Sequence, residues 1–159
     1  MEKKLADKIS KDFDMSDYRI SEEDFKWLEK TYNGFMMDYF ASEFSHRMVP
    51  YCGRYMSKGT ERVDAFALDW SRGFGYFHPP VSEVFRVIEK AKAEKAKGIL
   101  LVPDWPGSVV VAVVEAQEDK TLRWVCTRRM RFESPDWMES GVFRGRPEFG
   151  MRVYEMNVL

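Results

Sequence analysis

The sequence has few of the residues that build metal centres and disulfide frameworks. Its 159 residues include two cysteines, Cys52 and Cys126, and two histidines, His46 and His78. These four residues do not recur at the spacing of zinc ligands, and two cysteines are too few for a disulfide framework. The sequence therefore predicts no metal site, and its thiols are typical of the reduced cysteines of an intracellular protein.

Long hydrophobic runs and a large excess of one charge are also absent. The longest apolar run lies in residues 108–114 and is far shorter than the ~20 residues of a membrane-spanning helix. The first eleven residues are charged and lack the apolar core of a signal peptide. The net charge is −1, so no overall field attracts the protein to nucleic acid or to a membrane. We therefore expect no membrane partner, and contact with nucleic acid would need a local basic patch.

Apolar and aromatic residues are plentiful by contrast. They make up 45% and 15% of the chain, which is typical of a packed globular core. A chain of this length forms one domain of about 100–200 residues. We expect residues 18–159 to form a single domain, preceded by a flexible, charged lead-in over residues 1–17.

The clearest secondary-structure pattern is a strand–helix–strand unit, with strands at 74–78 and 98–102 and a helix at 82–97. The first strand, in "GFGYFHPP", is ended by two prolines, because proline cannot donate to a central ladder. Apolar residues at helical spacing follow, between a Ser82 cap and a closing Gly98. Such a unit crosses over right-handed and makes its two strands parallel.

Other segments carry further predictions. The apolar segment at 35–41 is expected to join the same parallel sheet. Ser21 and Asp24 form a capping box at the start of a helix. The β-branched segment at 108–120 is ambiguous between helix and strand, and we favour a helix. The remaining strands are expected at 123–132 and 150–158.

Four motifs in a fixed order carry a resemblance to a known family. They are "MDYFAS", "VDAFALDW", "YFHPP" and "ILLVPDW", and the match around them runs from about Asp17 to Met156. In this order and spacing they resemble the domain downstream of reverse transcriptase and RNase H in DIRS-type retroelements, which use a tyrosine recombinase. That domain is in turn similar, more distantly, to phage DNA N6-adenine methyltransferases.

The resemblance implies both a fold and a site. The fold is α/β: a Rossmann-like, methyltransferase-type mixed sheet with flanking helices. A strand end and a nearby acid would bind S-adenosylmethionine, and a tetrapeptide after a later strand would act on a flipped base. The implied cofactor-binding residues are Asp38, Phe40, Ala41, Ser42 and Asp64, and the implied catalytic residues are His78, Pro79 and Pro80, with Val81 in fourth place.

Two positions of that tetrapeptide depart from the family pattern. The first is normally Asp or Asn, which accepts a hydrogen bond from the target amino group, and here it is His78. The fourth is normally an aromatic residue that stacks on the flipped base, and Val81 offers no π-face. We therefore expect a non-catalytic domain of retroelement origin that needs no cofactor and acts as a nucleic-acid or protein interaction module.

Other interpretations stay open on the sequence alone. One alternative is an active S-adenosylmethionine-dependent DNA adenine N6-methyltransferase with a divergent His-Pro-Pro motif, and another is a host protein that kept the fold for a cellular partner. Each candidate residue also has a purely structural interpretation: Asp38 and Asp64 can cap backbone N–H groups, and His78 can pack in the core.

Basic residues gather in the last third of the chain. Between residues 120 and 152, eight Lys or Arg stand against four Asp or Glu. Such an excess indicates either an ordinary solvated strand surface or a contact with nucleic acid. The residues expected at a nucleic-acid contact are Arg128, Arg129, Arg131, Arg144 and Arg146.

Overall fold

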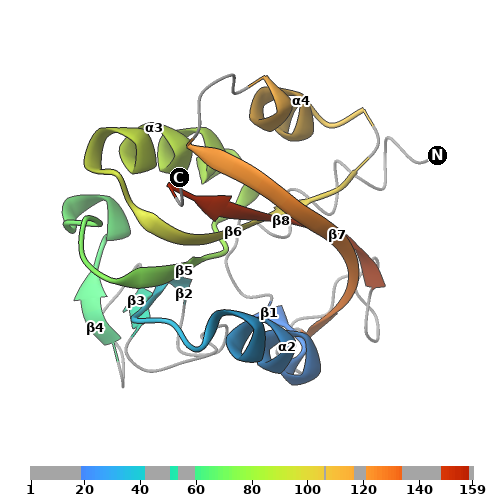
Figure 1. Cartoon of the computed structure of the whole chain (residues 1–159), viewed down its shortest axis with the longest axis horizontal. Helices are drawn as coiled ribbons and strands as arrows, with labels where there is room; N and C mark the ends of the chain where they lie inside the picture. Colours follow the sequence, from blue (N-terminus) through green and yellow to red (C-terminus); the bar gives the residue numbers. More distant parts are fainter. Residues whose placement is uncertain are drawn as a thin grey trace.

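The computed structural model describes residues 19–41, 51–53, 60–105, 107–116, 121–133 and 148–157. The expected lead-in lies outside these ranges, and the extent of the domain stays a prediction. The elements, labelled as in Figure 1, are β1 (Arg19–Ile20), α2 (Glu22–Tyr32), β2 (Asp38–Ala41), β3 (Tyr51–Gly53), β4 (Thr60–Val63), η1 (Ala65–Ala67), β5 (Phe74–Phe77), η2 (Val81–Glu83), α3 (Val84–Glu94), β6 (Lys97–Pro103), α4 (Val109–Glu115), β7 (Leu122–Glu133) and β8 (Glu148–Met156).

Eight strands form one mixed sheet in the order β1-β7-β8-β6-β5-β2-β3-β4. Five neighbouring strands of this sheet, β4, β3, β2, β5 and β6, are parallel to one another. β8 runs antiparallel to both of its neighbours, β6 and β7, and β1 is antiparallel to β7. The predicted α/β class and the parallel arrangement of the three expected strands, now β2, β5 and β6, are confirmed.

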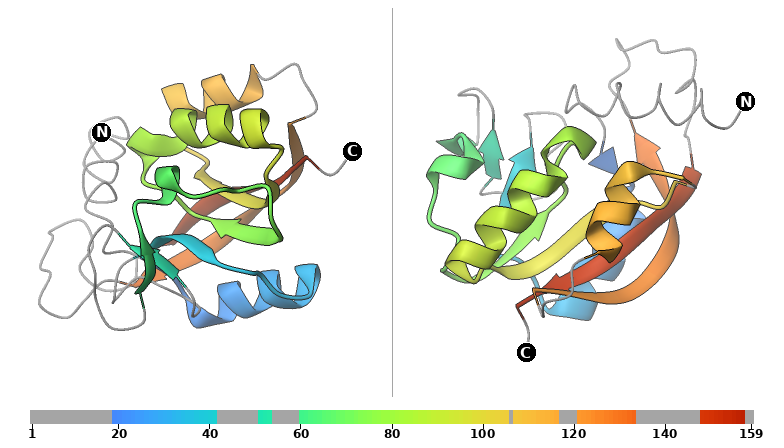
Figure 2. Two further views of the ribbon diagram at one scale, coloured as in Figure 1. Left: turned by 90° about the vertical axis from the view of Figure 1, so that its left-hand side faces the viewer. Right: turned by 90° about the horizontal axis from the view of Figure 1, so that it is seen from above.

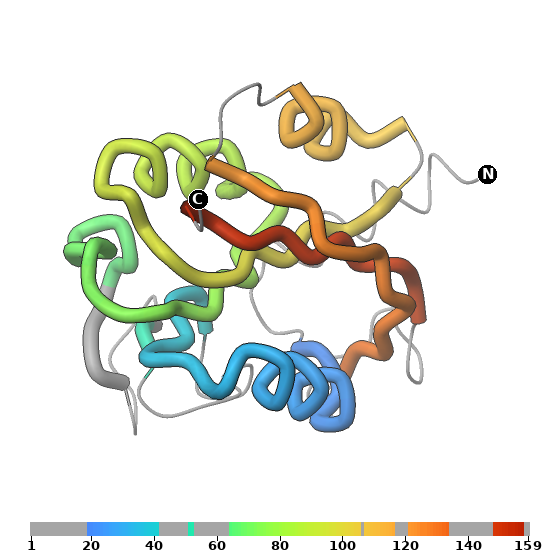
Figure 3. The backbone as a smooth tube through the Cα atoms, viewed as in Figure 1, coloured from blue at the N-terminus to red at the C-terminus, as the bar shows by residue number. Residues whose placement is uncertain are grey.

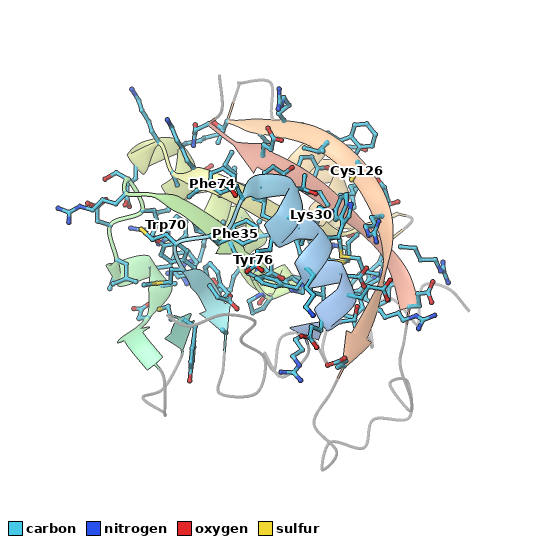
Figure 4. The ribbon with its side chains drawn as sticks, turned by 60° about the horizontal axis from the view of Figure 1, so that its bottom comes forward. Lys30, Phe35, Trp70, Phe74, Tyr76 and Cys126 are labelled. Carbon is cyan, nitrogen blue, oxygen red and sulfur yellow. The ribbon has the colours of Figure 1, made fainter. Side chains whose placement is uncertain are left out.

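Helices cover both faces of the sheet, with α3 and α4 on one face and α2 on the other (Figures 1 and 2). Successive strand residues alternate between the two faces, so β5 sends Tyr76 to the α2 face and Phe77 to the α3 face. Figure 4 views the α2 face, where Phe35, Phe74 and Tyr76 lie together beside the helix. Each face therefore has its own apolar core.

Helix α2 is fixed to the far end of the sheet through a buried carboxylate. Its N-cap, Ser21, accepts the N–H of Asp24 at 3.2 Å, as the capping box predicts. Oδ2 of Asp24 accepts the Ser21 hydroxyl at 2.7 Å and the backbone N–H of Arg131 at 3.0 Å. The Ser21 N–H in turn donates to the carbonyl of Arg131 at 2.8 Å. One acid thus caps the helix and ties it to β7.

The strand–helix–strand unit forms as predicted, with two differences at the ends of its helix. Ser82 lies in the 3₁₀ turn η2, so α3 begins at Val84, after the N-cap Glu83. Lys95, in the left-handed conformation, ends α3, so the prediction that Gly98 closes the helix is wrong. Gly98 lies in β6 opposite Gly75 of β5 instead.

The Gly75–Gly98 pair brings the two strands into close contact. A Cβ on Gly98 would overlap the carbonyl oxygen of Gly75 and lie 2.9 Å from its amide nitrogen. On the other side of the pair, a Cβ on Gly75 would lie 2.6 Å from the rings of Tyr39 and Phe77. Those two rings stack with centroids 4.6 Å apart. Both glycines are therefore required by packing rather than by helix capping.

Gly98→Ala should lower the free energy of unfolding by about 1–3 kcal/mol or more, because the added methyl group meets rigid sheet backbone. Chemical denaturation of both proteins measures the difference. Gly150→Ala is the matched control, since a Cβ in that β8 position finds its nearest atom at 3.4 Å, in the Thr127 side chain. Equal effects of the two substitutions would contradict this account.

Candidate functional site

The order of the parallel strands reverses between β2 and β5. From β2 the chain adds β3 and β4 on one side and later adds β5 and β6 on the other. In open α/β sheets the loops that leave such a point diverge at the carboxyl ends of the strands, and ligands bind in the gap. The candidate site is therefore at the carboxyl ends of β2 and β5.

A pocket of about 230 Å³ lies at this edge. Its volume is slightly below the range of about 300–1,000 Å³ that is typical of small-molecule sites. The residues come from β2, from β3, from the segment after β4, from the segment between β5 and α3, and from the start of α3. They are Tyr39, Phe40, Ala41, Cys52, Asp64, Ala65, Phe66, Pro80, Glu83 and Arg86.

Four residues that the resemblance assigned to the site line this pocket: Phe40, Ala41, Asp64 and Pro80. Phe40 and Ala41 end β2, and Pro80 follows β5. Segments distant in the sequence are thus brought together at one edge of the sheet.

Asp64 is the exposed acid of the pocket. It has a left-handed backbone, with φ 62°, and its Oδ1 accepts the N–H of Phe66 at 3.1 Å. Among the described residues its carboxylate has no cationic partner. The structural interpretation as a turn cap is therefore correct for one oxygen, and the second oxygen leaves Asp64 able to accept a hydrogen bond from a ligand.

An arginine at the rim was not anticipated from the sequence. The guanidinium of Arg86, in α3, lies 4.0 Å from the ring centroid of Phe66 and 3.0 Å from a carboxylate oxygen of Glu83. All three residues line the pocket. The crossover position of α3 brings Arg86 there, so no local pattern marks Arg86 in the sequence.

Cys52 supplies a thiol to the pocket, and this thiol is unreactive near pH 7. It is buried, and burial together with the carboxylates of Asp64 and Asp38 raises its pKa to about 11. The neutral thiol is therefore the form present near pH 7, and Cys52 contributes an apolar wall rather than a nucleophile.

The other two cofactor-binding candidates are Asp38 and Ser42. Asp38 is buried at the first residue of β2, opposite Tyr51 and Tyr76, and it does not line the pocket. Ser42 lies outside the described residues. At the end of β2, Ala41 pairs with Gly53 of β3.

His78 lies on the opposite side of the strand from the pocket. Its ring is 6.4 Å from that of Tyr76 and 6.1 Å from that of Phe132, on the α2 face. Burial lowers its pKa to about 4, so it is neutral near pH 7. Val81 packs against the core on the same face, and Pro79 is buried. The tetrapeptide is thus divided, with only Pro80 lining the pocket.

The candidate arginines occupy two faces of β7. Arg128 lies over the ring of Trp27 at 4.4 Å and 3.4 Å from Asp24, so it serves the packing of α2. Arg129 and Arg131 are exposed and both contact Glu148 of β8, at 2.7 and 3.4 Å. The last two candidates, Arg144 and Arg146, lie outside the described residues.

Comparisons with known proteins found no matching family model, no similar curated protein and no similar solved structure. Within the described ranges, no three His, Cys, Asp or Glu residues are grouped so as to hold a metal ion. No helix in that part of the chain is long and apolar enough to cross a membrane.

The position of His78 beside the rings of Tyr76 and Phe132 predicts a pH dependence of stability. Its pKa is 6.5 in an unfolded chain and about 4 in the folded protein. Above about pH 6.5 it is neutral in both states. As the pH falls from there towards 4, the unfolded chain binds a proton that the folded protein excludes, so stability is lost. Between about pH 7.5 and about pH 5, the wild type should therefore lose more thermal stability than His78→Phe, which keeps a ring. Equal losses would show that the imidazole does not titrate in this way.

Proposed function

We propose that this chain is a methyltransferase-like domain of retroelement origin that no longer transfers methyl groups and acts by binding. Its ligand would be the adenosine part of S-adenosylmethionine or of a related nucleoside. The observation that carries the proposal is the pocket at the reversal of strand order, lined by Phe40, Ala41 and Asp64. Its partner would be nucleic acid or protein.

The strand order supports this proposal. Numbered in order of appearance, the parallel strands β4-β3-β2-β5-β6 run 3-2-1-4-5, as in the doubly wound sheets that bind dinucleotides. Beyond the fifth parallel strand comes the antiparallel β8, between β6 and β7, so the sheet is mixed, which suits the fold that the resemblance implies.

The chemistry of the pocket suits a nucleoside. The carboxylate of Asp64 can accept hydrogen bonds from ribose hydroxyls, and the rings of Phe40 and Tyr39 provide an apolar wall. When bound, S-adenosylmethionine would supply an activated methyl group. The pocket volume fits the nucleoside part of the cofactor better than the whole of it.

The position of His78 argues against methyl transfer. An amino group that attacks a methyl group needs a hydrogen-bond acceptor close to it. The imidazole lies among Tyr76 and Phe132 on the α2 face, whereas the pocket opens on the α3 face. Val81 supplies no ring for an extruded base, and base stacking is worth about 1–3 kcal/mol. Extrusion itself costs a few kcal/mol, so little would hold the base in place.

Ligand binding can be tested by calorimetry with S-adenosylmethionine and S-adenosylhomocysteine. We expect both to bind, and Asp64→Asn to weaken binding about tenfold, which corresponds to about 1.4 kcal/mol for a charge-assisted hydrogen bond. Asn keeps the turn cap and tolerates the left-handed backbone, so the fold is preserved. Asp69→Asn is the matched control, because Asp69 also accepts an N–H two residues on, from Ser71 at 2.9 Å, and lies outside the pocket. Absence of binding by the wild type would overturn the proposal.

Methyl transfer is a separate test. With labelled S-adenosylmethionine and single- or double-stranded DNA, the wild type should transfer no label. His78, in the place of the hydrogen-bond acceptor, faces away from the pocket, and Val81 has no ring to stack on the base. Transfer by the wild type that is abolished in His78→Ala would contradict this and favour an active enzyme. Transfer restored by His78→Asp together with Val81→Tyr would show that these two positions reach the pocket, and it would contradict the divided tetrapeptide.

A further inference from the structure

One side of β7 is left open to solvent. All four of its residues Trp124, Thr127, Arg129 and Arg131 are exposed, and Trp124 is 56% exposed. We call these four residues the outer β7 face. An exposed tryptophan on a regular strand is unusual, because a large ring is normally packed away from water.

A bulge places the four residues on one side. Side chains on a strand normally alternate between its two faces, but the β7–β8 register shifts between Trp124 and Cys126. The extra residue at this bulge lets Trp124 share a face with Thr127, Arg129 and Arg131. Their partners on β8 are every second residue, which confirms the common side. Trp124 pairs with Tyr154, Thr127 with Arg152, Arg129 with Gly150 and Arg131 with Glu148.

The helices of this side of the sheet stop short of the outer β7 face. α4 ends at Glu115, whose carboxylate contacts Arg152 at 2.9 Å. Figure 3 follows β7 as it bends away from α4 towards α2. Gly150, opposite Arg129, adds no side chain to the surface. The strand therefore presents its side chains over an open stretch of sheet.

The two arginines share one carboxylate. The Nε atoms of Arg129 and Arg131 lie 2.7 and 3.4 Å from Glu148, so two positive charges face one negative charge. Their side chains are 68% and 61% exposed, and exposed ion pairs contribute only about 0–1 kcal/mol. Each guanidinium has five N–H groups, so both can contact an anion without leaving Glu148.

The spacing of these groups fits a single nucleic-acid strand. Residues two apart on a strand are separated by about 6.8 Å, a distance that one phosphodiester unit of an extended strand can span. Trp124 lies about 14 Å from Arg129, towards the amino end of β7, so its ring would meet a base of a different nucleotide. Only an unpaired base exposes the π-face that an indole can stack on.

We propose that the outer β7 face binds single-stranded nucleic acid, with phosphates on Arg129 and Arg131 and a base on Trp124. This rests on the proposed role of the domain as an interaction module, but not on the nucleoside pocket. It also revises the expected contact residues. Arg128 belongs to the opposite face, where Trp27 and Asp24 hold it, and Trp124 takes its place.

The test is fluorescence anisotropy of the full chain with a labelled oligothymidylate and with a DNA duplex, over a range of salt concentrations. We expect the single strand to bind more tightly than the duplex. Arg129→Gln with Arg131→Gln should reduce the slope of log K against log salt by about 1.4, since two phosphate contacts are lost. Trp124→Ala should weaken binding about 5- to 150-fold without changing that slope.

Arg72→Gln with Lys97→Gln is the matched control. It removes the same charge from exposed residues next to the amino ends of β5 and β6, so binding should not change. Thermal unfolding of each variant verifies that it is folded. No binding at low salt, equal losses in the control, or no effect of Trp124→Ala would overturn the proposal. The same variants should bind S-adenosylmethionine as the wild type does. A failure of the nucleic-acid proposal can therefore be told apart from a failure of the nucleoside pocket.

Discussion

The reversal of strand order between β2 and β5 is the constraint on which the site depends. β3 and β4 extend the sheet in one direction and β6 in the other, so the segments that follow β2 and β5 separate at the carboxyl edge. Within the sheet, the close Gly75–Gly98 contact packs β5 against β6. The pocket is a consequence of topology, and its chemistry is set by the residues that end each strand.

Local patterns predicted most of the fold. The strand–helix–strand unit, the capping box at Ser21 and the helix in the valine-rich segment each depend on neighbouring residues, and each formed. The parallel arrangement of β2, β5 and β6 followed from right-handed crossover. The role of Gly98 was misjudged, because its contact with Gly75 joins two strands and a glycine near a helix end has the same local signature.

The candidate site was predictable only in part, because side-chain direction depends on pairing between distant segments. The resemblance located Asp64 and Pro80, which line the pocket, yet it did not give the direction of His78, which alternation along β5 sends to the other face. Arg86 reaches the pocket through the position of a whole helix. Composition likewise predicted one patch of arginines, whereas Arg128 pairs with Asp24 of α2.

The central claim is that a nucleoside ligand binds at the reversal of strand order. Hydrogen exchange of the full chain, measured with and without S-adenosylmethionine, tests it most directly, since it maps the contact as well as detecting it. The account predicts slower exchange of the backbone amides at 39–41, 64–66 and 81–86, with little change along β7. Unchanged exchange in those three segments, or protection confined to another part of the sheet, would contradict it.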